Sequence, residues 1–248
     1  MTEAQRSDVD EVQALLDLGQ SHINSRYEDP ALDIFLRALA IVEPQPDSVL
    51  KADCLNAVAL AYFRRGSFGD ARSYFQRVKE VVERLNDDAY VGMMDHNIGM
   101  TYLREEAWEV ALPYYERAIP RLREAGRVLI LPITMHSVAQ IHDRLGRPER
   151  ALEEYGSVAQ LLADGANPNE LANVHENVAR LHRRYGRQAE AYESVLKALA
   201  IRREVGPSRQ GGRRVFVFAA MQALRLGRPL HAIGHMFGLA RQLFDVRR

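Results

Sequence analysis

The sequence predicts an all-α fold, a solenoid of six helix-turn-helix hairpins with about 12 helices. One observation is an alanine that recurs every 40 residues, and after 41 at its last copy: Ala31, Ala71, Ala111, Ala151, Ala191 and Ala232. A second observation is another small residue twelve positions before each alanine: Gly19, Ala59, Gly99, Ala139, Ala179 and Ala220. Because small side chains let two helix backbones come close, the paired columns predict two crossing helices in every repeat.

The second helix of each repeat begins at the recurring alanine. A bulky residue follows four positions later: Phe35, Phe75, Tyr115, Tyr155, Val195 and Met236. A further apolar residue follows seven positions after the alanine: Ala38, Val78, Ala118, Val158, Ala198 and Leu239. Since offsets of four and seven lie on one helical face, these columns predict an apolar stripe that packs against the first helix.

The first helix ends in a turn that glycine marks five residues before the alanine. This position holds Gly66, Gly146, Gly186 and Gly227. Glycine past a helix end is a usual stop signal, and Pro148 and Pro229 suit the first turn of the helix that follows. Each repeat is therefore predicted to be a helical hairpin.

The hairpins are expected at about residues 10–43, 48–85, 88–125, 130–164, 168–204 and 212–246, which form one superhelical domain over 10–246. Residues 1–9 are expected to be disordered. The connection at 206–212 is rich in glycine, so the sixth hairpin is expected to dock most freely. Pro120 falls inside the second helix of the third hairpin and should kink or shorten it.

A small residue, an alanine twelve positions later, an aromatic at plus four and an alanine at plus seven resemble the tetratricopeptide repeat (TPR) signature. The resemblance covers about residues 10–246. The repeat is longer than the family's usual 34 residues, so the chain looks like the long-period branch found in bacterial regulators. An aromatic early in the first helix, common in the family, is missing: the positions read Leu15, Leu55, Asp95, Met135, His175 and Val215. The resemblance implies a right-handed α-solenoid.

The resemblance also implies that the first helices line a concave groove. The candidates for binding a peptide there are Asn56, Phe63, Arg64, Met93, His96, Asn97, Met100, Arg104, His136, Gln140, Arg144, Asn173, Asn177 and Arg180. Amide side chains can bond a peptide backbone without demanding its sequence, so peptide binding is favoured over simple packing. Arg64, Arg104 and Arg144 also close helices, where a cation complements the helix dipole, and this structural interpretation of their recurrence is preferred to an arginine ladder.

The leading function is a non-catalytic protein- or peptide-binding scaffold or adaptor, which the resemblance places as the sensor or interaction module of a bacterial regulatory system. The sequence has no P-loop, dinucleotide glycine pattern or nucleophile elbow, so no enzyme activity and no cofactor are predicted. No metal site is predicted either. Cys54 is the one cysteine, and His231 and His235 share a helix face without a third ligand.

Structural self-assembly through the terminal hairpins is the second hypothesis. The last helix carries more apolar residues than one packing face needs, and Met236, Phe237 and Phe244 are the self-association candidates, which would give a homodimer. Charge is also uneven. Residues 1–164 hold 18 Lys and Arg against 27 Asp and Glu, and residues 165–248 hold 15 against 6. This pattern suits an acidic partner, head-to-tail association, or solvated faces with no partner.

Nucleic-acid binding through the basic C-terminal third is less favoured, because stacking aromatics are few around its arginines, which are Arg202, Arg203, Arg209, Arg213 and Arg214. The chain is expected to be cytoplasmic and not to enter a membrane. Its first residues lack a secretory signal, no stretch approaches about 18 apolar residues, and the single cysteine fits a reducing compartment.

Overall fold

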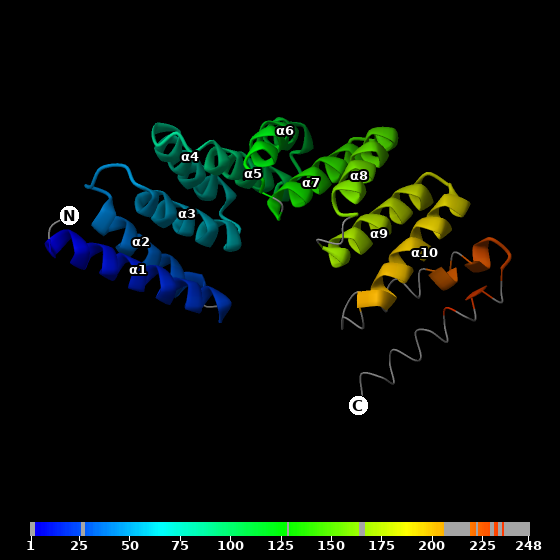
Figure 1. Cartoon of the computed structure of the whole chain (residues 1–248), viewed down its shortest axis with the longest axis horizontal. Coiled ribbons are helices and arrows are strands. Elements are labelled where there is room, and N and C mark those ends of the chain that lie inside the picture. The colour runs from blue at the N-terminus through cyan, green and yellow to red at the C-terminus, as the bar shows by residue number, and fades with distance from the viewer. Residues whose placement is uncertain are drawn as a thin grey trace, which may run out of the picture. The chain divides into compact units, whose positions relative to one another are not determined.

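The computed structural model describes residues 3–25, 28–127, 129–163, 167–205, 219–221, 223–228, 231–232 and 235. Its helices are α1 (Glu3–Asn24), α2 (Glu28–Val42), α3 (Val49–Arg64), α4 (Phe68–Arg84), α5 (Asp88–Arg104), α6 (Trp108–Glu124), α7 (Ile130–Arg144), α8 (Pro148–Leu161), α9 (Pro168–Arg184) and α10 (Gln188–Val205) (Figure 1). No strand occurs among these described residues, and the all-α prediction is confirmed.

The chain divides into two compact units, residues 1–134 and 135–248, with the boundary inside α7. In the first unit α1 packs on α2, α3 on α4 and α5 on α6, and the successive pairs stack through α2 on α3 and α4 on α5. Their buried side chains form one core, which extends from Val12 to Ile98. In the second unit α8 packs on α9 and α9 on α10. Four of the six predicted hairpins are thus present as packed helix pairs: α1 with α2, α3 with α4, α5 with α6 and α9 with α10.

In the first and third hairpins an aromatic ring lies over the small residue of the first helix. In the first hairpin, a Cβ added at Gly19 would stand 2.3 Å from a ring carbon of Phe35. In the third, a Cβ at Gly99 would stand 3.1 Å from the ring of Tyr115. The small residue and the plus-four aromatic are therefore two halves of one contact that sets the distance between the helices.

The turn between the two helices of a hairpin needs a residue in the left-handed conformation. Gly66 has φ +81°, and its N–H donates to the Phe63 carbonyl at 3.0 Å while the next N–H, of Ser67, reaches back to Tyr62 at 3.0 Å. These two bonds satisfy carbonyls at the helix end. In the third hairpin Glu106 takes the same place with φ +60°. A residue with a Cβ is strained there.

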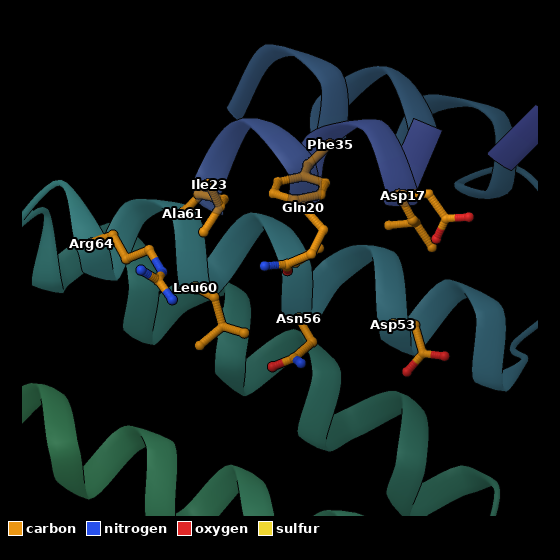
Figure 2. Close-up of a pocket in the computed structure, with 11 residues that line it drawn as sticks. Asp17, Gln20, Ile23, Phe35, Asp53, Asn56, Leu60, Ala61 and Arg64 are labelled. Carbon is orange, nitrogen blue, oxygen red and sulfur yellow. The ribbon is translucent and has the colours of Figure 1, made fainter. Parts of the chain in front are cut away.

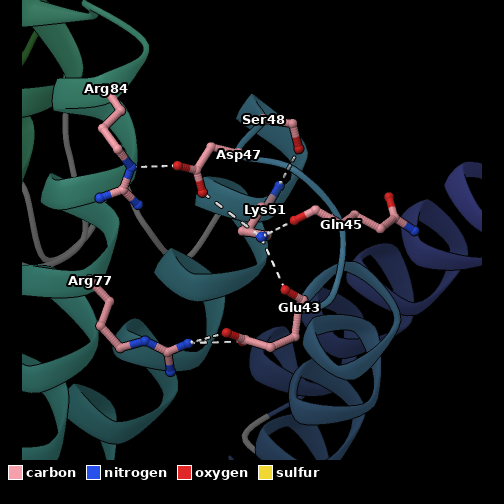
Figure 3. A network of polar contacts seen from close by, with 7 residues as sticks. All are labelled: Glu43, Gln45, Asp47, Ser48, Lys51, Arg77 and Arg84. Atoms are coloured by element: carbon pink, nitrogen blue, oxygen red, sulfur yellow. Dashed lines mark hydrogen bonds and ion pairs between the residues drawn. The ribbon is translucent and has the colours of Figure 1, made fainter.

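Lys51 organises the connection between the first two hairpins (Figure 3). Its ammonium group is mostly buried and donates to the carbonyl oxygen of Glu43 at 3.1 Å and to that of Gln45. The Asp47 carboxylate lies 3.8 Å away. Arg77 of α4 bonds both carboxylate oxygens of Glu43, at 2.7 and 2.8 Å. This network satisfies the carbonyls past the end of α2 and ties α4 to the first hairpin.

Asp95 stands in the column where the family usually has an aromatic, and its carboxylate is fully buried. Lys79 of α4 lies 2.9 Å from it, and Arg121 and Arg117 of α6 lie 3.4 and 3.7 Å from it. A buried charge is tolerated only when it is paired. The carboxylate therefore joins α5 to the helices on both sides.

Two expectations need correction. Residues 1–9 were expected to be disordered, but α1 begins at Glu3. The helix extends because Asp8, near its start, accepts a hydrogen bond from Gln45 at 3.4 Å and Val12 is fully buried. Pro120 does not shorten α6, which continues to Glu124 because the last turn is held by the buried side chain of Leu122. Most of the predicted sixth hairpin lies outside the described residues.

Replacing Gly19 by alanine should lower the free energy of unfolding by about 1–3 kcal/mol, because the new methyl group overlaps the packed ring of Phe35. Gly156 is the matched control. It lies inside α8 with nothing within 4 Å of an added Cβ, so Gly156→Ala should raise stability by about 0.5–1 kcal/mol. Urea denaturation followed by circular dichroism measures both. Equal effects of the two substitutions would contradict the close crossing.

Glu106→Gly should raise the free energy of unfolding by about 0.5–1 kcal/mol, since relief of the left-handed strain exceeds the entropy cost of glycine. The reverse change at the equivalent turn, Gly146→Ala, should cost about 1 kcal/mol, because Gly146 has φ +69°. Thermal denaturation of the two variants checks the signs. A loss of stability in Glu106→Gly would show that its side chain contributes more than the turn geometry does.

Candidate functional site

A pocket lies between the first helices of the first two hairpins, α1 and α3, with α2 behind it (Figure 2). Its volume is about 270 Å³, and its lining is Leu16, Asp17, Gln20, Ile23, Phe35, Asp53, Asn56, Ala57, Leu60, Ala61 and Arg64. On α3 the contributors Asp53, Asn56, Leu60 and Arg64 are three or four residues apart, so they share one helical face. The pocket thus brings together Asn56 and Arg64, two of the residues predicted for peptide binding.

Asn56 has unused hydrogen-bonding capacity. Its Oδ1 is buried and has no hydrogen-bond partner among the described residues. A buried amide oxygen left unpaired costs about 1–3 kcal/mol. Gln20 extends from α1 toward α3 on the other side of the same pocket (Figure 2). The pocket therefore presents two amide side chains, one of which lacks a partner in the chain itself.

Charged groups stand at the two ends of the pocket. Asp17 and Asp53 lie at one end and Arg64 at the other, with Leu60 and Asn56 between them (Figure 2). Asp53 accepts a hydrogen bond from the hydroxyl of Tyr90 at 2.8 Å. Burial raises the pKa of the Asp53 carboxyl above its usual range, and the Tyr90 bond opposes this shift.

The other candidates of the first unit do not line this pocket. Phe63 packs against Phe68 with ring centroids 5.5 Å apart, and the guanidinium of Arg104 lies 5.7 and 5.8 Å from these two rings. Arg104 thus stabilises the turn of the second hairpin. Met93, Asn97 and Met100 are half-buried, and Met93 packs against the core.

His96 was expected to face the groove, but it is buried. Its Nδ1 lies 2.9 Å from the hydroxyl of Thr134, and its ring meets that of Tyr115 edge-on at 5.3 Å. Burial lowers its pKa to about 4, so the ring is neutral at physiological pH. The ring of Tyr115, which covers Gly99, also draws His96 into the core. His96 is therefore a packing residue.

In the second unit, polar side chains of α7 and α9 form a network around His136. Its Nδ1 donates to Glu170 Oε1 at 2.9 Å, and this bond lowers the pKa of the Glu170 carboxyl. Its Nε2 then accepts from Asn177 Nδ2 at 2.6 Å and from Gln140 Nε2 at 3.0 Å. A neutral imidazole nitrogen has one lone pair, so the two amides compete for it.

Arg202 of α10 orients the neighbouring residues of α9. Its guanidinium is nearly buried and bonds Glu176 Oε1 at 2.8 Å and Asn173 Oδ1 at 2.7 Å. Asn173 in turn donates to Glu170 at 3.1 Å. Asn177 accepts from the exposed Arg180. The predicted residues His136, Gln140, Asn173, Asn177 and Arg180 are therefore brought together, and Arg144 is exposed at the end of α7.

The sequence analysis missed four residues of these two surfaces. Gln20 and Asp17 lie one residue after and two residues before Gly19, the positions that Leu60 and Ala57, which also line the pocket, take relative to Ala59 in the second repeat. The same spacing would have found them. Glu170 and Arg202 lie outside the groove columns, and no periodic signal marks them.

Self-association and nucleic-acid binding were predicted from residues that lie mostly outside the described part of the chain. Met236, Phe237 and Phe244, predicted for self-association, lie outside the described residues. Of the arginines proposed for nucleic acid, Arg202 is nearly buried against Glu176, and Arg209, Arg213 and Arg214 lie outside the described residues.

His231 and His235 both approach the hydroxyl of Tyr192, at 3.0 and 3.2 Å. No group of three or more His, Cys, Asp or Glu side chains among the described residues could hold a metal ion. None of the described helices is long and apolar enough to cross a membrane.

Solved structures show which folds this one resembles. BtubC (BKLC) from P. vanneervenii is 18% identical, with a TM-score of 0.69 over 100% of this chain and 93% of that one. The apo quorum sensor NprR from B. thuringiensis is 14% identical, with a TM-score of 0.67 over 93% and 64%. The Rap conjugation gene regulator of plasmid pLS20, in complex with the Phr* peptide, is 13% identical, with a TM-score of 0.63 over 90% and 61%. At these identities the likeness shows the fold alone.

Family models match the middle of the chain. Two models described as tetratricopeptide repeat match residues 52–88 and 90–164. No curated protein matches the sequence. The 40-residue period, the consecutive helix pairs and both models agree that residues 52–88 and 90–164 form tetratricopeptide repeats.

Proposed function

We propose that this chain is a non-catalytic protein-binding scaffold that holds an extended peptide segment in the pocket between α1 and α3. The observation that carries the proposal is the buried Oδ1 of Asn56, which has no partner inside a pocket of about 270 Å³. A peptide N–H would supply the missing donor. The cost of leaving this oxygen unpaired would then be recovered on binding.

The pocket suits a peptide backbone because it combines amides with an apolar wall. Asn56 and Gln20 can each donate and accept, as a peptide unit does. Leu60 and the largely buried ring of Phe35 supply apolar surface beside them. Such an arrangement binds main chain by hydrogen bonds and places alternate side chains against apolar surface.

The surface of α7 and α9 in the second unit supports the same function independently. His136 Nε2 can fully satisfy only one of its two amide donors, and the contact with Asn177 is the shorter one. The exposed Gln140 therefore has an N–H group to offer to a carbonyl of a bound segment.

The Rap regulator, which has a similar fold, was solved in complex with a peptide, and this supports a peptide or protein as the partner here. NprR is described as a quorum sensor. The context that fits these likenesses is an adaptor or sensor module of a bacterial regulatory system, working in the cytoplasm.

Asn56→Leu should weaken peptide binding about tenfold and at the same time raise the free energy of unfolding by about 1 kcal/mol. The leucine removes an unpaired buried oxygen from the free protein and a hydrogen-bonding group from the complex. Peptides selected from a random 12-residue display library supply the ligand. Isothermal titration calorimetry gives its Kd, and urea denaturation gives the stability.

Asn177→Leu is the matched control for the stability effect. Asn177 bonds both His136 and Arg180, so the same substitution should cost about 1–2 kcal/mol there. If Asn56→Leu instead lowers stability and leaves the Kd unchanged, Asn56 is a structural residue and the proposed site is wrong.

A further inference from the structure

We infer that the pocket between α1 and α3 selects a dipolar peptide segment, with a basic side chain held by Asp17 and Asp53 and an acidic side chain held by Arg64. This inference rests on the proposed function and adds to it the charge and the spacing of the ligand. The basis is the position of opposite charges at the two ends of one pocket (Figure 2).

The acidic end is built by two helices. Asp53 of α3 is held in place by the hydroxyl of Tyr90, which donates to Oδ1, and its Oδ2 has no hydrogen-bond donor among the described residues. Asp17 of α1 accepts a hydrogen bond from the amide of Gln13, at 3.1 Å, on its own helix. Neither carboxylate has a cation within ion-pair distance among the described residues. A lysine or arginine side chain of a ligand would supply one.

The basic end is a guanidinium that the chain leaves unpaired. Arg64 is exposed at the end of α3, and no acidic group of the described residues pairs with it. Two other arginines of the same column have partners: Arg104 lies over aromatic rings and Arg184 bonds Asp143 at 2.6 Å. Arg64 is therefore available to a carboxylate, for which a guanidinium is geometrically suited.

Helix geometry sets the spacing of the two ligand charges. Asp53 and Arg64 are eleven residues apart on α3, which corresponds to about 16 Å along the axis. An extended chain advances about 3.3 Å per residue. The basic and acidic side chains of the ligand should therefore be about five residues apart. Asn56 and Leu60 lie between the two ends and face the intervening backbone.

The test uses four labelled peptides, acetylated and amidated so that only side chains carry charge. Each has Ala-Asn-Leu-Ala between two charged residues: Arg and Glu, Glu and Arg, Arg and Arg, or Glu and Glu. Fluorescence anisotropy with the full chain should show one dipolar order binding about fivefold more tightly than the Arg/Arg and Glu/Glu peptides. In Arg64→Glu both ends are acidic, so the Arg/Arg peptide should become the tightest ligand.

Arg65→Glu is the matched control, because it makes the same charge change one residue further along. Arg65 does not line the pocket and pairs with the exposed Asp29 at 3.1 Å. It should leave the order of the four peptides unchanged. Circular dichroism confirms that both variants are folded.

The peptide experiments distinguish a failure of this inference from a failure of the proposed function. If the four peptides bind equally and Asn56→Leu weakens all of them, the pocket binds peptides and the charge selection is wrong. If Arg64→Glu and Arg65→Glu change the order alike, general charge rather than the pocket decides, and the inference is also wrong. If none of the peptides binds, both proposals fail.

Discussion

The close crossing of the two helices in each hairpin is the contact on which the rest of the structure depends. The ring of Phe35 occupies the space that a side chain at Gly19 would need, and Tyr115 does the same at Gly99. This contact fixes the rotation of the first helix about its own axis, because one side of that helix must face the ring. The opposite side is then free to carry polar groups. Since the small residues recur with a 40-residue period, the polar sides of the first helices are expected to recur with them.

The polar side chains on these helices differ in whether their hydrogen-bonding and charged groups have partners among the described residues. Asp95 is buried with three cations around it, and Lys51 is buried with carbonyls around it, so both stabilise stacking. Asn56 is buried without a partner for its oxygen, and Arg64 has no acid beside it. The unpaired buried oxygen of Asn56 lowers the stability of the free protein, whereas the exposed guanidinium of Arg64 stays hydrated. Both residues line the pocket between α1 and α3.

Much of the fold follows from the sequence because the signal repeats. The alanine, small-residue and aromatic columns predict the helix pairs, and Gly66 and Gly146 predict the left-handed turns. The candidate site is less predictable. The position of a residue within the repeat predicts only that it faces the neighbouring repeat. Asn56 stays in a pocket, whereas His96, in the same column, is drawn under Tyr115 and bonds Thr134. Whether such a residue lies in a pocket or in the core depends on the volume of the residues on the adjacent helix. The repeat period does not predict that volume. Arg202, which approaches from a second helix, has no periodic signature at all.

The most direct test of a binding site formed by adjacent first helices is a nuclear magnetic resonance titration of the labelled chain with a selected peptide. The side-chain amide resonances of Asn56 and Gln20 should shift together, with the backbone amides of α1 and α3 that carry the pocket residues. Shifts confined to the turns between hairpins, or to the second helices α2 and α4, would contradict the claim that the free faces of the first helices bind the ligand.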